Sequence, residues 1–333
     1  METLQTKKQI WLDAADLLAE TPLPIQYLVD GILPLGTVGD ISGPPGDGKS
    51  SLVGHLAMSV ATKQTMWFGR KIAGGKVAII GGEKSRREVW IRDLHRTWPK
   101  GAARPEPGNL CIYGEQEPLW TWANGTGLWK ETDTYSRVFE YLQAMQPVLV
   151  ILDTIMRVAE GGNQIDNVQQ AALGRKIEAL GRTLGTTILT VSHSNQSSTK
   201  EPLSWRLHYM SRAGGNGLPG ILRWCAGVTR LQATDLPLQG LDVTADDLQS
   251  RKLIAFGVSK HNEMPTPHWS HNVAALFEID NTGALFLLKD LVPTTAGKKP
   301  AKKGNGKNWG TLKNEYDHEE VNYASAADPL GLM

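Results

Sequence analysis

Residues 41–52 read ISGPPGDGKSSL and place three glycines and two prolines in one turn that ends in Lys49, Ser50 and Ser51. The preceding residues 36–43, GTVGDISG, predict a strand, and residues 50–64, SSLVGHLAMSVATKQ, have the apolar spacing of a helix. Such a turn is seldom needed for packing alone. The stretch therefore predicts a ligand-binding loop at the start of an α/β unit.

The loop matches the phosphate-binding motif G-x-x-x-x-G-K-[ST] in full. Its glycines let backbone N–H groups turn inward around a β-phosphate, at the positive end of the following helix. We expect Lys49 to reach the β- and γ-phosphates and the Ser50 hydroxyl to bind Mg²⁺. A chance match in a glycine-rich turn is the alternative, and the strand-to-helix context argues against it. The predicted nucleotide-binding residues are Gly43, Pro44, Pro45, Gly46, Asp47, Gly48, Lys49, Ser50 and Ser51.

Three polar residues at the ends of predicted strands are candidates to complete the site. Asp153 follows VLVIL and is expected to hold the water shell of the magnesium, so that Ser50 and Asp153 form the metal site. Glu83 ends KVAIIGGE and is expected to orient or deprotonate the attacking water. His193, in LTVSHS, is expected to sense the γ-phosphate. Each has a structural alternative, because strands often end in polar residues for turn chemistry or solvation.

Composition limits the classes of protein that the chain can represent. The net charge is only +1, so nucleic-acid binding would depend on a local patch. The two cysteines form no CxxC or Cys/His cluster, which argues against a disulfide scaffold or zinc site and fits a reducing compartment. No signal-peptide pattern or apolar run of membrane-spanning length occurs. We therefore expect a cytoplasmic protein without a membrane partner.

Strands and helices alternate along the chain. Apolar runs predict buried strands at 36–43, 76–83, 109–114, 147–155 and 186–194. Helices are expected at 50–64, 85–98 and 167–185. This alternation predicts an α/β fold of three layers, with a mainly parallel twisted sheet between helices. Later apolar segments at 221–232, 251–262 and 274–291 are expected to extend the sheet as antiparallel β-hairpins.

The predicted organisation is an N-terminal helix and linker arm at 1–30, a core at 31–292 and a flexible tail at 293–333. Within the core, residues 101–134 are expected to be an irregular insertion, and 197–220 a mobile loop. The tail begins with a Lys-rich linker, which predicts disorder. Its acidic end, with an apolar tip, is either solvated or a short docking motif for a partner.

Four stretches together resemble the RecA-type ATPase core. They are the loop with its flanks, KVAIIGGE, PVLVILDTIMRV and TILTVSHSNQ, and the resemblance covers about residues 10 to 290. LVDGILPLG, at 28–36, and WFGRKIAGGKV, at 67–77, narrow it to the RepA-like hexameric replicative helicases of small plasmids and phages. Two departures are that SHSNQ lacks the lysine that often follows the histidine, and that no primase or zinc module is present.

The resemblance implies a homo-oligomeric, hexameric ring that hydrolyses ATP with Mg²⁺ between subunits and translocates on single-stranded DNA, in the cytoplasm of a bacterium or a phage-infected host. Each site then needs a cation from the next subunit, for which the resemblance suggests Arg212 in SRAGGNG and Lys260 in VSKHN. A solvated surface cation is the alternative for both. The predicted catalytic set is Glu83, Lys49, Asp153, His193, Arg212 and Lys260.

The resemblance also implies two DNA-binding loops, at 157–169 after Asp153 and at 195–216 after His193. Their predicted phosphate contacts are Arg157, Lys200 and Arg206. Trp205 and Tyr209 either stack on bases or pack the loop against the protein.

Three functions fit these features. An ATP-dependent replicative DNA helicase is favoured by the RepA-like segments and by the lack of a separate polymerisation domain. The alternatives are a RecA-like recombinase or strand-annealing ATPase, and a DNA-bound ATPase that acts as a loader or scaffold. In each case the tail is a candidate docking segment for another replication protein, by analogy alone.

Overall fold

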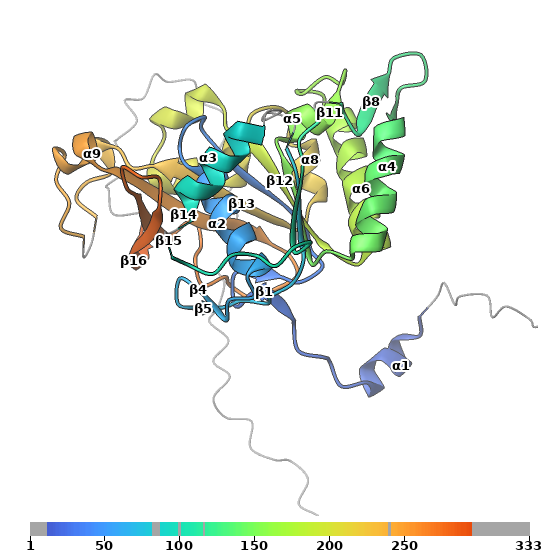
Figure 1. Cartoon of the computed structure of the whole chain (residues 1–333), viewed down its shortest axis with the longest axis horizontal. Coiled ribbons are helices and arrows are strands. Elements are labelled where there is room, and N and C mark those ends of the chain that lie inside the picture. The colour runs from blue at the N-terminus through green and yellow to red at the C-terminus, as the bar shows by residue number, and fades with distance from the viewer. Residues whose placement is uncertain (1–11, 82–86, 99–100, 116, 239–240, 295–333) are drawn as a thin grey trace, which may run out of the picture. The chain divides into compact units, whose positions relative to one another are not determined.

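The computed structural model of the protein describes residues 12–81, 87–98, 101–115, 117–238 and 241–294, which form a nine-stranded sheet (Figure 1). Six strands are parallel, in the spatial order β7 (Leu110–Tyr113), β6 (Val77–Ile80), β10 (Leu149–Asp153), β12 (Thr187–His193), β3 (Val38–Gly43) and β13 (Trp224–Arg230). Three antiparallel strands extend the sheet beyond β13, namely β14 (Lys252–His261), β15 (Val273–Ile279) and β16 (Leu285–Pro293). The predicted α/β fold with a mainly parallel sheet is confirmed.

Helices cover both faces of the sheet, because side chains alternate along each strand. Ile79 and Ile151 pack in the same cluster as α2 (Lys49–Ala61), with Trp90 of α3 (Arg87–Thr97) against it. Ile80 and Leu152 face the opposite cluster, which contains residues of α4 (Asp133–Met145) and α6 (Asn167–Leu184). Strands covered in this way are apolar throughout, as a parallel sheet requires.

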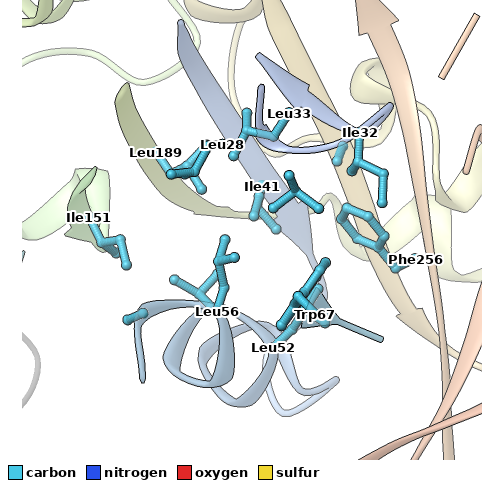
Figure 2. Packing of buried hydrophobic residues seen from close by; sticks show 14 of the residues in the cluster. Leu28, Ile32, Leu33, Ile41, Leu52, Leu56, Trp67, Ile151, Leu189 and Phe256 are labelled. Atoms are coloured by element: carbon cyan, nitrogen blue, oxygen red, sulfur yellow. The ribbon is translucent and has the colours of Figure 1, made fainter. Parts of the chain in front are cut away.

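The α2 side of the core holds the loop between β3 and α2 in place. Figure 2 shows Leu52 and Leu56 of α2 facing Ile41 of β3 and Leu189 of β12. Burial of each such leucine contributes about 1.5–3 kcal/mol. The start of α2, where the loop ends, is thus fixed against the centre of the sheet.

The N-terminal boundary of the core differs from the predicted one. Helix α1 (Ala14–Ala19) buries no residue, as expected of an arm. Strand β1 (Tyr27–Val29) pairs with β2 (Leu33–Pro34), and Leu28 is completely buried in the α2-side cluster. The core therefore begins at about residue 27 and not at 31.

The predicted irregular insertion at 101–134 contains a β-hairpin. Strands β8 (Trp120–Ala123) and β9 (Leu128–Glu131) pair antiparallel, and β8 also pairs with β11 (Ala159–Glu160). β11 follows α5 (Ile155–Val158), immediately after β10. The hairpin therefore supports the segment that begins at Asp153.

The connection between β12 and β13 is built of short helices that bury leucines. It contains η1 (Gln196–Lys200), α7 (Leu203–Arg206), η2 (Tyr209–Ser211) and α8 (Gly217–Ile221). Leu203, Leu207 and Leu218 are at most 2% exposed. The prediction of a mobile loop at 197–220 was wrong, because these leucines anchor the connection to the core.

The remaining described elements are β4 (Met66–Trp67), β5 (Arg70–Lys71), η3 (Ala233–Asp235) and α9 (Asp247–Ser250). Strand β16 ends at Pro293 and Thr294 is buried. Residues 295–333, with almost the whole predicted linker and tail, lie outside the described residues.

Candidate nucleotide-binding site

The glycine-rich loop connects the carboxyl end of β3 to the amino end of α2. A Cβ atom at Gly43 would lie 2.0 Å from the Val228 carbonyl oxygen of β13, so only glycine fits there. Gly48 caps α2 with a φ of 92°, in the left-handed region that favours glycine, and its Cα faces Ile254 and Ile279. The loop therefore turns tightly against β13 and the antiparallel strands, and it directs the first N–H groups of α2 outward.

Lys49 and Ser50 occupy the first turn of α2. Lys49 is 5% exposed, and its Nζ donates hydrogen bonds to the carbonyl oxygens of Gly43 (2.7 Å) and Pro44 (2.8 Å). The ammonium thus lies inside the concave side of the loop, where it would meet a phosphate. Pro45 and Gly46 are exposed at the rim, whereas Pro44, Asp47, Gly48 and Ser51 are half-buried.

The two predicted magnesium residues lie in contact. The Ser50 hydroxyl donates to Asp153 Oδ2 over 3.2 Å, although the two residues are 103 positions apart. Asp153 ends β10, and Ser50 lies on the helix that follows β3. One serine and one carboxylate suit Mg²⁺, which keeps several waters and binds substrate phosphates.

His193 lies beside the loop at the end of β12. It is paired in register with Gly43, and the Ser194 N–H donates to the Gly43 carbonyl oxygen over 3.1 Å. A side chain at this position lies next to the start of the glycine-rich loop. Glu83, the predicted base, lies outside the described residues.

Arg212 is enclosed within its own chain. Its side chain is 4% exposed, its Nε donates to Ser192 Oγ over 3.1 Å, and it lies 3.5 Å from Asp40 Oδ2. Asp40 also accepts hydrogen bonds from Thr190 and Ser192. A guanidinium buried in this way cannot extend to a neighbouring subunit, so the geometry argues for a structural role in place of the predicted trans-acting one.

Arg206 is also buried and paired. It is 2% exposed, forms an ion pair with Asp235, and donates to Thr229 Oγ1 (3.2 Å) and to the Arg230 carbonyl oxygen (2.9 Å). The prediction of a DNA-phosphate contact placed this residue on a mobile loop. Because it points into the protein, we leave it out of the candidate DNA contacts.

Lys260 lies near the end of β14. Its Nζ donates to the carbonyl oxygens of Pro219 (2.7 Å) and Gly220 (3.0 Å), at the end of α8. Burial lowers the pKa of Lys260, and the nearby exposed Arg223 acts in the same direction. Two cations therefore lie close together at the start of β13, and Arg223 was not among the predicted residues.

The other candidate DNA contacts are accessible. Arg157 and Lys200 are exposed, on α5 and η1. Trp205 is 45% exposed, and its ring stacks on His208 with an interplanar angle of 4°. Tyr209 packs against the cluster of α4 and α6, which supports the packing alternative for that residue.

Sequence reasoning missed Asp40, Thr229 and Asp235. The side chains of all three are buried polar partners of the loop or of the two arginines. An Asp within an apolar strand, such as Asp40 in GTVGDISG, is the one signal that indicated an unusual buried charge.

Comparison with known proteins decides the family. A family model described as an AAA domain (AAA_25) matches residues 2–199, more than half of the chain. The chain belongs to the AAA domain family. This AAA domain is also similar to a solved structure described as an ATPase domain, with 13% identity and a TM-score of 0.51 over 76% of this chain and 85% of that one. No match was found among curated proteins.

The family and the structural likeness together confirm the expected P-loop ATPase fold of RecA type. The glycine-rich loop is the P-loop of this fold. None of the helices among the described residues is long and apolar enough to cross a membrane.

Proposed function

We propose that the protein is an ATP-dependent DNA helicase of the replicative type, which forms a ring and moves along single-stranded DNA. The observation that carries the proposal is the contact between Ser50 and Asp153 beside the P-loop. At the same sheet edge, the segments that follow Asp153 and His193 leave the nucleotide site. A protein built in this way can change the conformation of both segments when a nucleotide binds and is hydrolysed.

The roles of the site residues follow from their positions. Loop N–H groups and Lys49 would bind the β- and γ-phosphates, while Ser50 and Asp153 would hold Mg²⁺. The metal would neutralise charge that develops on the phosphate oxygens. Glu83 would orient or deprotonate water, and His193 would contact the γ-phosphate side of the site.

DNA binding is proposed for the exposed residues alone. Arg157 and Lys200 are free of the deep burial that encloses Arg206, and each can neutralise one phosphate. The exposed face of Trp205 offers a surface on which a base can stack, a contact that contributes about 1–3 kcal/mol. This arrangement fits a single strand better than a duplex, because bases must be unpaired to stack.

The ring requires a cation from the neighbouring subunit at each ATP. Of the cations considered above, Arg223 is exposed and Lys260 is half-exposed next to it, whereas Arg212 is enclosed. We therefore assign the trans-acting role to the pair formed by Arg223 and Lys260. Arg223→Ala is expected to abolish DNA-stimulated hydrolysis and leave ATP binding intact; equal hydrolysis in parent and variant would exclude this residue.

The finer partners and place of action are also proposals. We expect a hexamer in the cytoplasm, with residues 294–333 as a docking segment for another replication protein. Deletion of that segment is expected to leave ATP hydrolysis unchanged and to weaken binding of DNA or the partner. Unchanged binding would remove the tail from the account.

Strand displacement on a forked duplex tests the helicase proposal, with Lys49→Ala as the inactive control. Displacement that requires ATP and is lost in the control supports the proposal. Stimulated hydrolysis without displacement would instead support a filament-forming recombinase or a loader. Electron micrographs of the protein on single-stranded DNA would then separate closed rings from filaments.

A further inference from the structure

The P-loop is tied to the connection between β12 and β13 by a chain of buried hydrogen bonds. Its P-loop end is Asp47, whose Oδ2 accepts from the Arg230 N–H (2.8 Å) and from the Thr229 hydroxyl (3.3 Å). Asp47 directly precedes Gly48, the residue that caps α2. Fixing the Asp47 carboxylate therefore restrains the peptide groups that would surround a phosphate.

Thr229 joins Asp47 to Arg206. The threonine is 1% exposed, and its hydroxyl accepts a hydrogen bond from Arg206 while it donates to Asp47. Asp235 holds the other side of the guanidinium, so Arg206 has one favoured position. A single hydroxyl is thus the junction between a buried ion pair and the P-loop.

Arg206 connects this junction to the protein surface. It ends the four-residue helix α7, in which the preceding residue, Trp205, is 45% exposed. The two neighbours point in opposite directions, one into the protein and one to solvent. A ligand that packs on Trp205 and moves α7 also moves the guanidinium that Thr229 contacts.

We propose that Thr229 is a positioning residue for the P-loop, and that Arg206 transmits the position of α7 to Asp47 through it. The inference deepens the proposed function, because it assigns the route by which single-stranded nucleic acid on Trp205 changes the affinity for ATP. It rests on the P-loop as the ATP site. Its structural part, the restraint of the P-loop by Thr229, holds for the free protein as well.

Thr229→Val is the test, because it removes the hydroxyl, keeps the shape and leaves the Arg206–Asp235 pair. We expect its KM for ATP to rise about fivefold, as loss of one buried hydrogen bond predicts. Oligothymidylate is expected to change this KM less in the variant than in the parent. Thr229→Ser keeps the hydroxyl and is expected to remain within about twofold of the parent. The exposed Thr183→Val is the control for a Thr-to-Val change elsewhere.

A readout without ATP separates positioning from loss of activity. Amide hydrogen exchange at residues 46–48 is expected to be faster in Thr229→Val than in the parent, with the unfolding midpoint preserved. Asp47→Asn is expected to reproduce the faster exchange, and the double variant to add little, because both changes break one link.

The outcomes distinguish this inference from the proposed function. Equal KM and equal exchange in Thr229→Val and the parent overturn the inference alone. A parent that binds no ATP overturns the proposed function, and with it the assigned route, whereas the exchange result still decides whether Thr229 restrains the P-loop. ATP binding that is sensitive to Thr229 without strand displacement overturns the helicase and supports the link.

Discussion

The P-loop and the connection between β12 and β13 face the same site but relate to the sequence in opposite ways. The P-loop is a run of consecutive residues with a local motif, and the structure shows it between a strand and a helix as the motif requires. The connection is rich in polar residues and glycine, and it nevertheless buries Arg206 and Arg212. The difference teaches that an exposed appearance in sequence does not separate a mobile loop from one held by buried charges.

The largest expected effect tests whether the connection is held in this way. Arg212→Leu leaves the carboxylate of Asp40, 2% exposed, without its cation. We expect a loss of about 3–5 kcal/mol in the free energy of unfolding, the usual result of breaking a buried pair. Urea denaturation measures it.

Arg251→Leu is the matched control, because its pair with Glu278 is 30% and 27% exposed. That change is expected to cost about 1 kcal/mol or less. Equal stability of the parent and Arg212→Leu would show that the connection is as loose as its sequence suggested.

The second effect tests the other side of the comparison, that the P-loop serves chemistry. Lys49→Ala is expected to reduce ATP hydrolysis by at least about 100-fold, as loss of one preorganised charge-stabilising group does. The unfolding midpoint is expected to change far less than in Arg212→Leu. Hydrolysis at the parental rate would mean that the measured activity arises at another site.

The third effect concerns the helix behind the P-loop. Burial lowers the pKa of His55 from 6.5 to about 4, and its Nδ1 accepts a hydrogen bond from Trp67 Nε1 over 3.1 Å. The unfolded chain binds this proton more readily, so stability is complete above about pH 6.5 and falls as the pH decreases toward 4. Between pH 7.5 and pH 5 the loss from this group is about 2 kcal/mol.

His55→Gln removes the titrating group and retains an acceptor for Trp67. The variant is expected to show a weaker decrease of the unfolding free energy between pH 7.5 and pH 5. Parallel pH profiles in the variant and the parent would contradict the buried neutral histidine.

The smallest effect sharpens the distinction between exposed and buried cations. Lys200→Ala is expected to lower the slope of log affinity against log salt for single-stranded DNA by about 0.7, the value for one phosphate contact. Arg157→Ala is expected to do the same. Titrations at several salt concentrations measure the slopes, and unchanged slopes would remove both residues from the DNA interface.

The parts of the fold that sequence predicts are those with a local signal. Apolar runs such as 147–155 gave the buried parallel strands, and the glycine-rich turn gave the P-loop. Strand-end residues could be assigned to one edge because parallel strands end together, as the contact of Ser50 with Asp153 shows.

The rest depends on pairs that are distant in sequence. Asp235 lies 29 residues from Arg206 and Thr229 lies 182 from Asp47, so no period or motif connects either pair. The β8–β9 hairpin was missed for a different reason. Its residues, WTWANGTGLWKE, carry a turn signal, but the high density of Trp, Gly and Pro around them obscured the alternation.

The central claim is that this P-loop drives a motor on single-stranded DNA, and steady-state ATP hydrolysis by the parent protein, with and without single-stranded DNA, tests it most directly. The account predicts magnesium-dependent hydrolysis that single-stranded DNA stimulates and duplex DNA does not. Hydrolysis at the same rate with and without single-stranded DNA would contradict it.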